Sequence, residues 1–81
     1  DELIISGGEN IDPSEAISTL KAIYRFNKIE SFRKKDSHWG EILGLYIYTN
    51  RDINSDEIKK KLKEKLSAYK IPKLIVIKKP L

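Results

Sequence analysis

The stretch "IISGGENIDP", residues 4–13, places two adjacent glycines and two carboxylates directly after an apolar run. Adjacent glycines either turn the chain tightly or leave the backbone bare, so that a ligand or another chain can approach it. The spacing of Gly7 and Gly8 fits neither a Walker phosphate loop nor a dinucleotide fingerprint. Taken alone, the two glycines favour a hairpin turn.

Side chains around the glycines carry groups that enzymes use in catalysis. Glu9 and Asp12 are carboxylates, but no histidine lies near them in the sequence, and Asp12 is better placed to cap a helix. Ser6 has no nearby base that would activate it as a nucleophile. These residues alone predict no catalytic centre.

Two later stretches combine an aromatic ring with polar neighbours. In "DSHWGE", Trp39 lies between His38 and a glycine, where the indole either covers the core or contacts a ligand. In "YKIPK", Tyr69 and Lys73 surround a proline, and such a pair suits a nucleotide, since a ring stacks on a base and lysines meet phosphates. The alternative is that Tyr69 completes a core stripe while the lysines stay in water.

Length and composition exclude several classes of site. A chain of 81 residues makes one small domain with little room for an internal active site, so any chemistry is expected against another surface. There is no cysteine, and the single histidine, His38, cannot build a zinc site by itself, so no metal is expected. The sequence shows no membrane span and no signal peptide, so a cytoplasmic protein with no membrane partner is expected.

The charge is distributed unevenly along the chain. Residues 1–50 hold six basic and eight acidic residues, whereas residues 51–81 hold ten and four. A positive second half favours an anionic partner, or else it is the solvated face of a lysine-rich helix.

Apolar spacing predicts four strands and two helices. The strands are expected in "ELIIS", "KIESFRKK", "ILGLYIYT" and "KLIVIK"; the third has two apolar faces, so it is expected to be covered on both sides. The first helix is expected to begin after Asp12, with Glu15 completing a capping box, and to end near Arg25–Phe26. The second follows Asn54 or Ser55, with an apolar stripe of Ile58, Leu62, Leu66 and Tyr69. It is expected to end before "KIP", because the residue before Pro72 is biased away from helical angles. The fold class is α+β, a small two-layer sandwich in which two helices pack a three-stranded sheet, plus a short N-terminal β-hairpin.

Three motifs taken together resemble one family. "DELIISGGENIDPSEA", then "DSHWGE" before an apolar strand, then "YKIPK" is similar to the C-terminal domain of the adenylate-forming acyl-CoA ligases, a group that includes luciferases and peptide-synthetase adenylation domains. Each motif is weak by itself, but their order and spacing from Asp1 to Leu81 are specific. The opening motif and the "GLYIY" strand favour the acyl- and aryl-CoA ligases within the group.

The resemblance implies a two-step enzyme that uses ATP with Mg²⁺ and then coenzyme A. A large N-terminal adenylation domain, the expected partner in the same chain, would bind ATP and a carboxylic acid substrate and form an acyl-adenylate. The small domain would then rotate, and the thiol of coenzyme A would displace AMP. Residues 1–81 would be this mobile C-terminal lid domain.

The resemblance also assigns roles to particular residues. Asp1 would be the hinge that absorbs the rotation between the two poses. Coenzyme A contacts are assigned to six residues: Gly7, Gly8, Glu9, Trp39, Tyr69 and Lys73. The glycines and Glu9 would wall a tunnel for the pantetheine arm, whereas the last three would lie near the bound coenzyme, its adenine and its phosphates.

Two departures from the family pattern affect what is expected of this chain. The family's catalytic lysine lies in a Gly-Lys stretch just after a segment like "IKKPL", and the sequence ends at Leu81 before such a stretch. No catalytic residue is therefore expected in 1–81, the isolated domain is expected to be inactive, and no cofactor is assigned to this fragment by itself. The segment "YRFNKIESFRKK" also lacks the proline-containing turn of many relatives.

Two other function classes compete with this interpretation: a stand-alone basic α+β module that binds nucleic acid through its lysine-rich helix, and an interaction domain without a ligand. Base-stacking platforms need aromatic residues clustered on one strand, which this sequence does not show, and the basic helix also carries acidic residues. No nucleic-acid partner is therefore expected.

Overall fold

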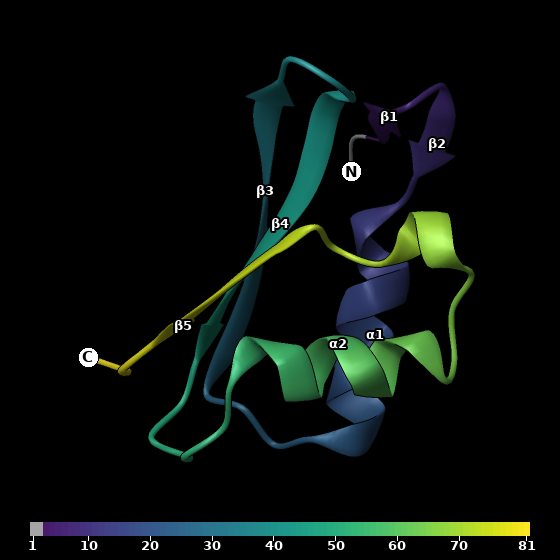
Figure 1. Cartoon of the computed structure of the whole chain (residues 1–81). Helices are drawn as coiled ribbons and strands as arrows, with labels where there is room; N and C mark the ends of the chain where they lie inside the picture. The colour runs from purple at the N-terminus through teal and green to yellow at the C-terminus, as the bar shows by residue number, and fades with distance from the viewer. Residues whose placement is uncertain (1–2) are drawn as a thin grey trace.

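The computed structural model describes residues 3–81 and has α+β architecture (Figure 1). The elements follow the order β1 (Ile4–Ser6), β2 (Glu9–Ile11), α1 (Pro13–Ile23), β3 (Lys28–Asp36), β4 (Gly40–Tyr48), α2 (Ser55–Lys63), the 3₁₀ turn η1 (Ala68–Lys70) and β5 (Leu74–Lys78). Both helices lie on the same side of the sheet, so the predicted two-layer sandwich is confirmed. The hinge assigned to Asp1 falls outside the described residues.

The sheet has five strands, not the predicted three with a separate hairpin. Strand β3 runs antiparallel to β4 along its whole length, from Lys28 opposite Tyr48 to Asp36 opposite Gly40. On the other edge of β4, the parallel strand β5 pairs only with the stretch from Gly44 to Tyr48. The start of β4 is therefore left for β1, which joins through Ser6 opposite Gly40, and β2 follows as the outermost strand. The hairpin thus belongs to the sheet because β5 is short.

The core lies between β4 and the helices. Alternate side chains of β4, Leu43, Leu45 and Ile47, are almost completely buried, as period-two patterning requires on a covered face. They belong to the same apolar cluster as Leu20 of α1 and Leu62 of α2. The core therefore holds the helix layer against the central strand.

The opposite face of β4 is covered by side chains of the sheet itself. Phe32 of β3 lies directly across from Gly44, and its ring stacks on Tyr46 with centroids 4.4 Å apart. The ammonium of Lys78 lies 4.4 Å from the centroid of the same tyrosine. Both faces of β4 are thus covered, as predicted. The helices cover one face, and a short aromatic stack covers the other.

The helix starts were predicted correctly, and both helices end earlier than their apolar spacing predicts. Helix α1 ends at Ile23, because Tyr24 already has extended backbone angles (φ −123°, ψ 158°), rather than near Arg25–Phe26. Asn54 caps α2 through its side-chain oxygen, which accepts from the Glu57 amide at 2.9 Å. That helix ends at Lys63, so the predicted stripe does not continue along one helix.

The chain beyond α2 does not continue as a helix, although the apolar spacing of Leu66 and Tyr69 predicts one. Leu66 packs against the core from a turn, and Ser67 has extended angles (φ −59°, ψ 149°) that end any helical continuation. Tyr69 then lies in η1 and remains 41% exposed, so it does not complete the core stripe. Figure 1 shows this yellow-green turn beneath β2, far along the chain from it.

Within the described residues, no helix has the length and apolar character needed to cross a bilayer.

Candidate functional site

The two adjacent glycines form the loop of the β1–β2 hairpin. Ser6 pairs with Glu9, which leaves Gly7 and Gly8 as a two-residue connection, and both have positive φ, 57° and 83°. Two positive φ angles are what a type I′ hairpin turn requires, and glycine adopts them without a Cβ penalty. A hairpin turn, one of the two explanations that the sequence allows for the adjacent glycines, therefore accounts for their backbone angles.

Gly7 also lies against the indole of Trp39. Its amide donates to the Trp39 carbonyl at 2.9 Å, and a Cβ built on Gly7 would be 2.6 Å from Cε3 of the ring. The indole is held there by the β3–β4 turn, where the Asp36 carboxylate accepts from the amides of His38 (3.0 Å) and Trp39 (2.8 Å). The bare Cα of Gly7 thus lets the indole pack directly on the hairpin.

Gly8 has a different environment. A Cβ at Gly8 would meet no atom within 4 Å, so its exposed side faces open space. Any steric need for glycine here, beyond its positive φ, has to come from a molecule outside the described residues.

Lys73 connects the indole to the start of β5. Its amide donates to the Leu43 carbonyl at 3.0 Å, which ties its backbone to β4. Its Nζ lies 4.1 Å from the centroid of the Trp39 ring, within the range of a cation–π interaction. The indole therefore contacts both Gly7 and the ammonium of Lys73, and it remains 39% exposed.

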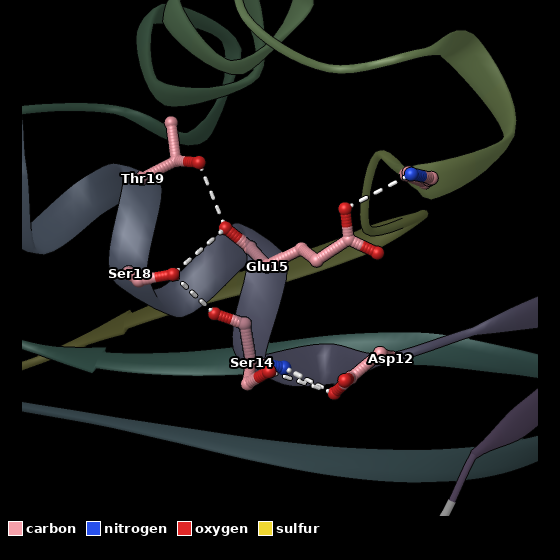
Figure 2. A network of polar contacts seen from close by, with 6 residues as sticks. Asp12, Ser14, Glu15, Ser18 and Thr19 are labelled. Carbon is pink, nitrogen blue, oxygen red and sulfur yellow. Dashed lines mark hydrogen bonds and ion pairs between the residues drawn. The ribbon is translucent and has the colours of Figure 1, made fainter.

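An ion pair between α1 and η1 positions the turn that carries Tyr69. Nζ of Lys70 donates to Oε1 of Glu15 at 2.9 Å, and Figure 2 shows the Glu15 carboxylate reaching away from α1 toward this partner. This hydrogen bond, together with the charge of Glu15, raises the pKa of Lys70. The Glu15 carboxylate accepts from Lys70, and this contact replaces the predicted capping box, in which Glu15 would reach back to the start of α1.

The start of α1 is capped by Asp12 as predicted. Its Oδ1 accepts from the amide (3.0 Å) and the hydroxyl (2.8 Å) of Ser14, as Figure 2 shows. The backbone hydrogen bond first, and the hydroxyl second, lower the pKa of Asp12. Asp12 thus ends the hairpin and begins α1, as a structural residue.

These segments surround one hollow of about 260 Å³. Its lining comes from the β1–β2 hairpin, the β3–β4 turn, η1 and the residue before β5: Ser6, Gly7, Glu9, Trp39, Ala68, Tyr69 and Lys73. Five of the six residues assigned to coenzyme A by resemblance therefore converge, although they are up to 66 positions apart; the exception is Gly8. Two lining residues, Ser6 and Ala68, were not predicted as contacts, and their only signal was adjacency to Gly7 and Tyr69.

The hollow combines one aromatic wall, one bare backbone stretch and charges of both signs. Trp39 and Tyr69 offer flat apolar surface, Gly7 adds no side chain, and Glu9 and Lys73 carry opposite charges. Such a lining suits a narrow, mostly apolar chain with a polar or anionic end. Within residues 3–81, no cluster of three or more histidine or acidic side chains could hold a metal ion.

Comparisons with known proteins bear on the family and the fold of the chain. No family model matches the sequence. The 2-succinylbenzoate–CoA ligase of Enterococcus faecalis is 38% identical over 74 residues, which cover 91% of this chain and 15% of the relative. The solved o-succinylbenzoate CoA synthetase of Bacillus subtilis, in complex with its acyl-adenylate intermediate, superposes with a TM-score of 0.84 at 33% identity and covers 98% of this chain and 16% of the other.

A ligase for a different class of acid has the same fold. The fatty acyl CoA synthetase of Mycobacterium tuberculosis superposes with a TM-score of 0.88 at 26% identity, again over 98% of this chain and 16% of its own. The chain belongs to the C-terminal domains of the adenylate-forming acyl-CoA ligases. It spans about 15% of the length of the curated relatives that it matches.

Membership of this domain family confirms the resemblance that the three motifs carry. It also places the hollow on the ligases' small domain, on the side where β1, β2 and η1 come together. The roles of the individual lining residues stay predictions, and they are taken up below.

Proposed function

We propose that this chain is the mobile C-terminal domain of an ATP-dependent acyl- or aryl-CoA ligase, and that the hollow at Trp39 receives coenzyme A in the thioester-forming step. The observation that supports this proposal is the convergence of four separate segments on one hollow, through the residues that the family resemblance assigns to the coenzyme. A lid domain with this wall could offer the thiol carrier a path to the acyl-adenylate.

The lining divides into parts with different tasks. Gly7 lets the Trp39 indole pack directly on the hairpin, and the hairpin and the ring together would form a wall along which the slender pantetheine arm passes. Tyr69 supplies an exposed ring for the adenine, and Lys73 supplies a cation for a phosphate. Glu9 lies at the wall, and Gly8 extends the bare surface toward the partner domain.

The intact enzyme would bind ATP with Mg²⁺ and a carboxylic acid on its N-terminal domain, and the hinge would lie at Asp1. ATP activates the acid as an adenylate; this domain then excludes water and orients the thiol. Because ATP and coenzyme A are cytoplasmic metabolites, the proposal places the protein in the cytoplasm.

For the acid itself, we propose o-succinylbenzoate, which would place the enzyme in menaquinone biosynthesis. The support is the 38% and 33% identity to ligases named for that acid. A double mutant of the Bacillus subtilis enzyme has also been solved with its product analogue OSB-NCoA. Acid selection itself belongs to the N-terminal domain, so the test must use the intact protein.

The test separates the two half-reactions of the intact ligase. Acyl-adenylate formation is followed by pyrophosphate release without coenzyme A, and thioester formation by consumption of free thiol. Tyr69→Ala is expected to raise the KM for coenzyme A about tenfold, because loss of base stacking costs on the order of 1–3 kcal/mol, and to leave adenylate formation unchanged.

Ile23→Ala is the matched control, since Ile23 is 39% exposed, close to the 41% of Tyr69, and does not line the hollow. Gly8→Leu is expected to repeat the selective loss relative to Gly8→Ala, which has the same backbone strain at φ 83° without the bulk, because no atom of the domain lies within 4 Å of a side chain there. Equal losses in both half-reactions for Tyr69→Ala would contradict a coenzyme role for the hollow. Failure of o-succinylbenzoate alone among tested acids would overturn only the acid assignment.

A further inference from the structure

The 3₁₀ turn that carries Tyr69 into the hollow is not held in place by burial of its own side chains. None of the residues of η1, Ala68–Lys70, is buried, and Ser67 before them makes no side-chain capping hydrogen bond. The chain is anchored on either side of the turn instead, by Leu66 packed against the core and by the buried Ile71. The ring of Tyr69 therefore lies on a segment that needs another contact to fix it.

An ion pair supplies such a contact between the turn and the helix layer. Nζ of Lys70 donates to Oε1 of Glu15 at 2.9 Å, across a separation of 55 positions in the chain (Figure 2). The Lys70 side chain is only 26% exposed, so the pair is partly sheltered from water. Glu15 lies in the first turn of α1, whose start is fixed by the Asp12 cap. The turn is thus tied to a firmly placed part of the fold.

The same ammonium lies over the ring of Tyr69. Nζ of Lys70 is 5.8 Å from the centroid of that ring, near the outer limit of a cation–π interaction. One cation therefore contacts both the Glu15 carboxylate and the aromatic ring. Because the carboxylate holds the ammonium in place, the ammonium covers one side of the ring and leaves the exposed remainder to the hollow.

Glu15 itself does not line the hollow. It can affect a ligand there either through Lys70 and the turn or through its negative charge at a distance. For an anionic ligand these two effects have opposite signs, because a nearby carboxylate repels an anion, whereas a carboxylate that fixes the turn favours binding. The direction in which affinity changes when Glu15 is removed therefore tells the two effects apart.

We propose that Glu15 is a positioning residue for coenzyme A, and that it acts through Lys70 by fixing the Tyr69 ring on which the adenine stacks. This inference rests on the proposed function, because the adenine is the group assigned to Tyr69 there. Glu15 makes no contact with the coenzyme. It holds the ring in place before the ligand arrives, so that binding does not have to order the turn.

The test measures the KM for coenzyme A in the intact ligase, with acyl-adenylate formation as a second readout. Glu15→Ala is expected to raise this KM about threefold, as for the loss of one partly exposed ion pair, and to leave adenylate formation unchanged. Glu15→Gln keeps a side-chain oxygen that can accept from Lys70, so its KM is expected to lie between those of the wild type and Glu15→Ala.

A double variant shows whether the effect passes through the ring. In Glu15→Ala/Tyr69→Ala there is no ring left to position, so the KM is expected to equal that of Tyr69→Ala alone. Glu57→Ala is the matched control, because Glu57 is the third residue of α2, as Glu15 is of α1, and does not line the hollow. It removes the same charge and is expected to leave the KM unchanged.

Three results would overturn the positioning role and leave the proposed function standing: an unchanged or lowered KM in Glu15→Ala, an equal loss of adenylate formation in that variant, or losses that add fully in the double variant. An unchanged KM in Tyr69→Ala would instead contradict the proposed coenzyme role of the hollow itself.

Discussion

Two glycines in different parts of this domain each lie against an aromatic ring, and they do so for different reasons. A Cβ on Gly7 would overlap Trp39, and a Cβ on Gly44 would overlap the ring of Phe32. Gly7 lies in a hairpin turn with φ 57°, beside an indole that is 39% exposed and faces a hollow. Gly44 lies in the middle of β4 and is buried beneath an aromatic stack.

Gly7 thus shapes an exposed surface, whereas Gly44 allows side chains to pack on the sheet. At Gly44 the missing side chain lets a cross-strand ring lie flat on the sheet, a known way to offset the low strand propensity of glycine. At Gly7 the backbone conformation itself demands glycine, and the indole then packs on the turn without losing its exposed face. Substitutions should therefore affect stability most at Gly44 and the ligand-facing surface most at Gly7.

The largest loss of stability is expected from Gly44→Ala. The new methyl group displaces the Phe32 ring, breaks its stacking on Tyr46 and forces the outer face to repack. Overpacking and the loss of an aromatic pair together predict a decrease of about 2 kcal/mol in the free energy of unfolding. Chemical denaturation of the 81-residue chain measures it.

A double-mutant cycle with Phe32→Ala is the control for this prediction. Without the ring, the methyl group at position 44 has space, and alanine is no worse than glycine in a strand. The cost of Gly44→Ala is therefore expected to disappear in the Phe32→Ala background. A cost that stays the same there would mean that the ring contact is not its cause.

A smaller loss, with a different signature, is expected from Gly7→Ala. The left-handed backbone costs a non-glycine residue about 1–2 kcal/mol, and the methyl group also pushes the indole away from the turn. The emission of Trp39, the only tryptophan in the chain, is expected to shift in the folded state. Gly8→Ala, at φ 83° with no atom within 4 Å of the added methyl group, is the matched control with backbone strain alone, and it is expected to leave the emission unchanged. If Gly7→Ala also leaves the emission unchanged, Gly7 and Trp39 are not coupled.

Much of the fold could be predicted because its signals are local. Asp12 and Asn54 were expected to cap helices, and both do, since a cap depends on a few neighbouring residues. The end of α2 could not be predicted, because Leu66 and Tyr69 continue the helical spacing while the chain leaves the helix at Ser67. Likewise, the addition of β1 to the sheet depends on how far β5 extends along β4, which no local pattern encodes.

The candidate site was only partly accessible from the sequence. The resemblance named Trp39, Tyr69 and Lys73, but their meeting around one hollow is a tertiary result of the β1–β4 pairing and of η1 folding under β2. The charge of the second half of the chain favoured an anionic partner but did not distinguish among the lysines of α2, because a lysine-rich helix usually presents a solvated face.

The smallest effect is expected at the polar edge of the aromatic face, where Tyr48 donates to the Glu30 carboxylate at 3.0 Å. This hydrogen bond is the main cause that lowers the pKa of Glu30 below its ordinary value of 4.5, with Lys28 as a second cause. A lowered pKa in the folded state means that the contribution to stability is fully present above pH 4.5 and is lost as the pH falls through the folded value.

Tyr48→Phe is therefore expected to reduce stability slightly at pH 7 and to flatten the dependence of stability on pH below 4.5. Denaturation midpoints measured between pH 3 and pH 7 check this, with Tyr69→Phe as the control, since its ring makes no contact with Glu30. If stability falls below pH 4.5 in Tyr48→Phe as it does in the wild type, the Tyr48–Glu30 hydrogen bond contributes no pH-dependent stability. The aromatic face would then be held by ring packing alone.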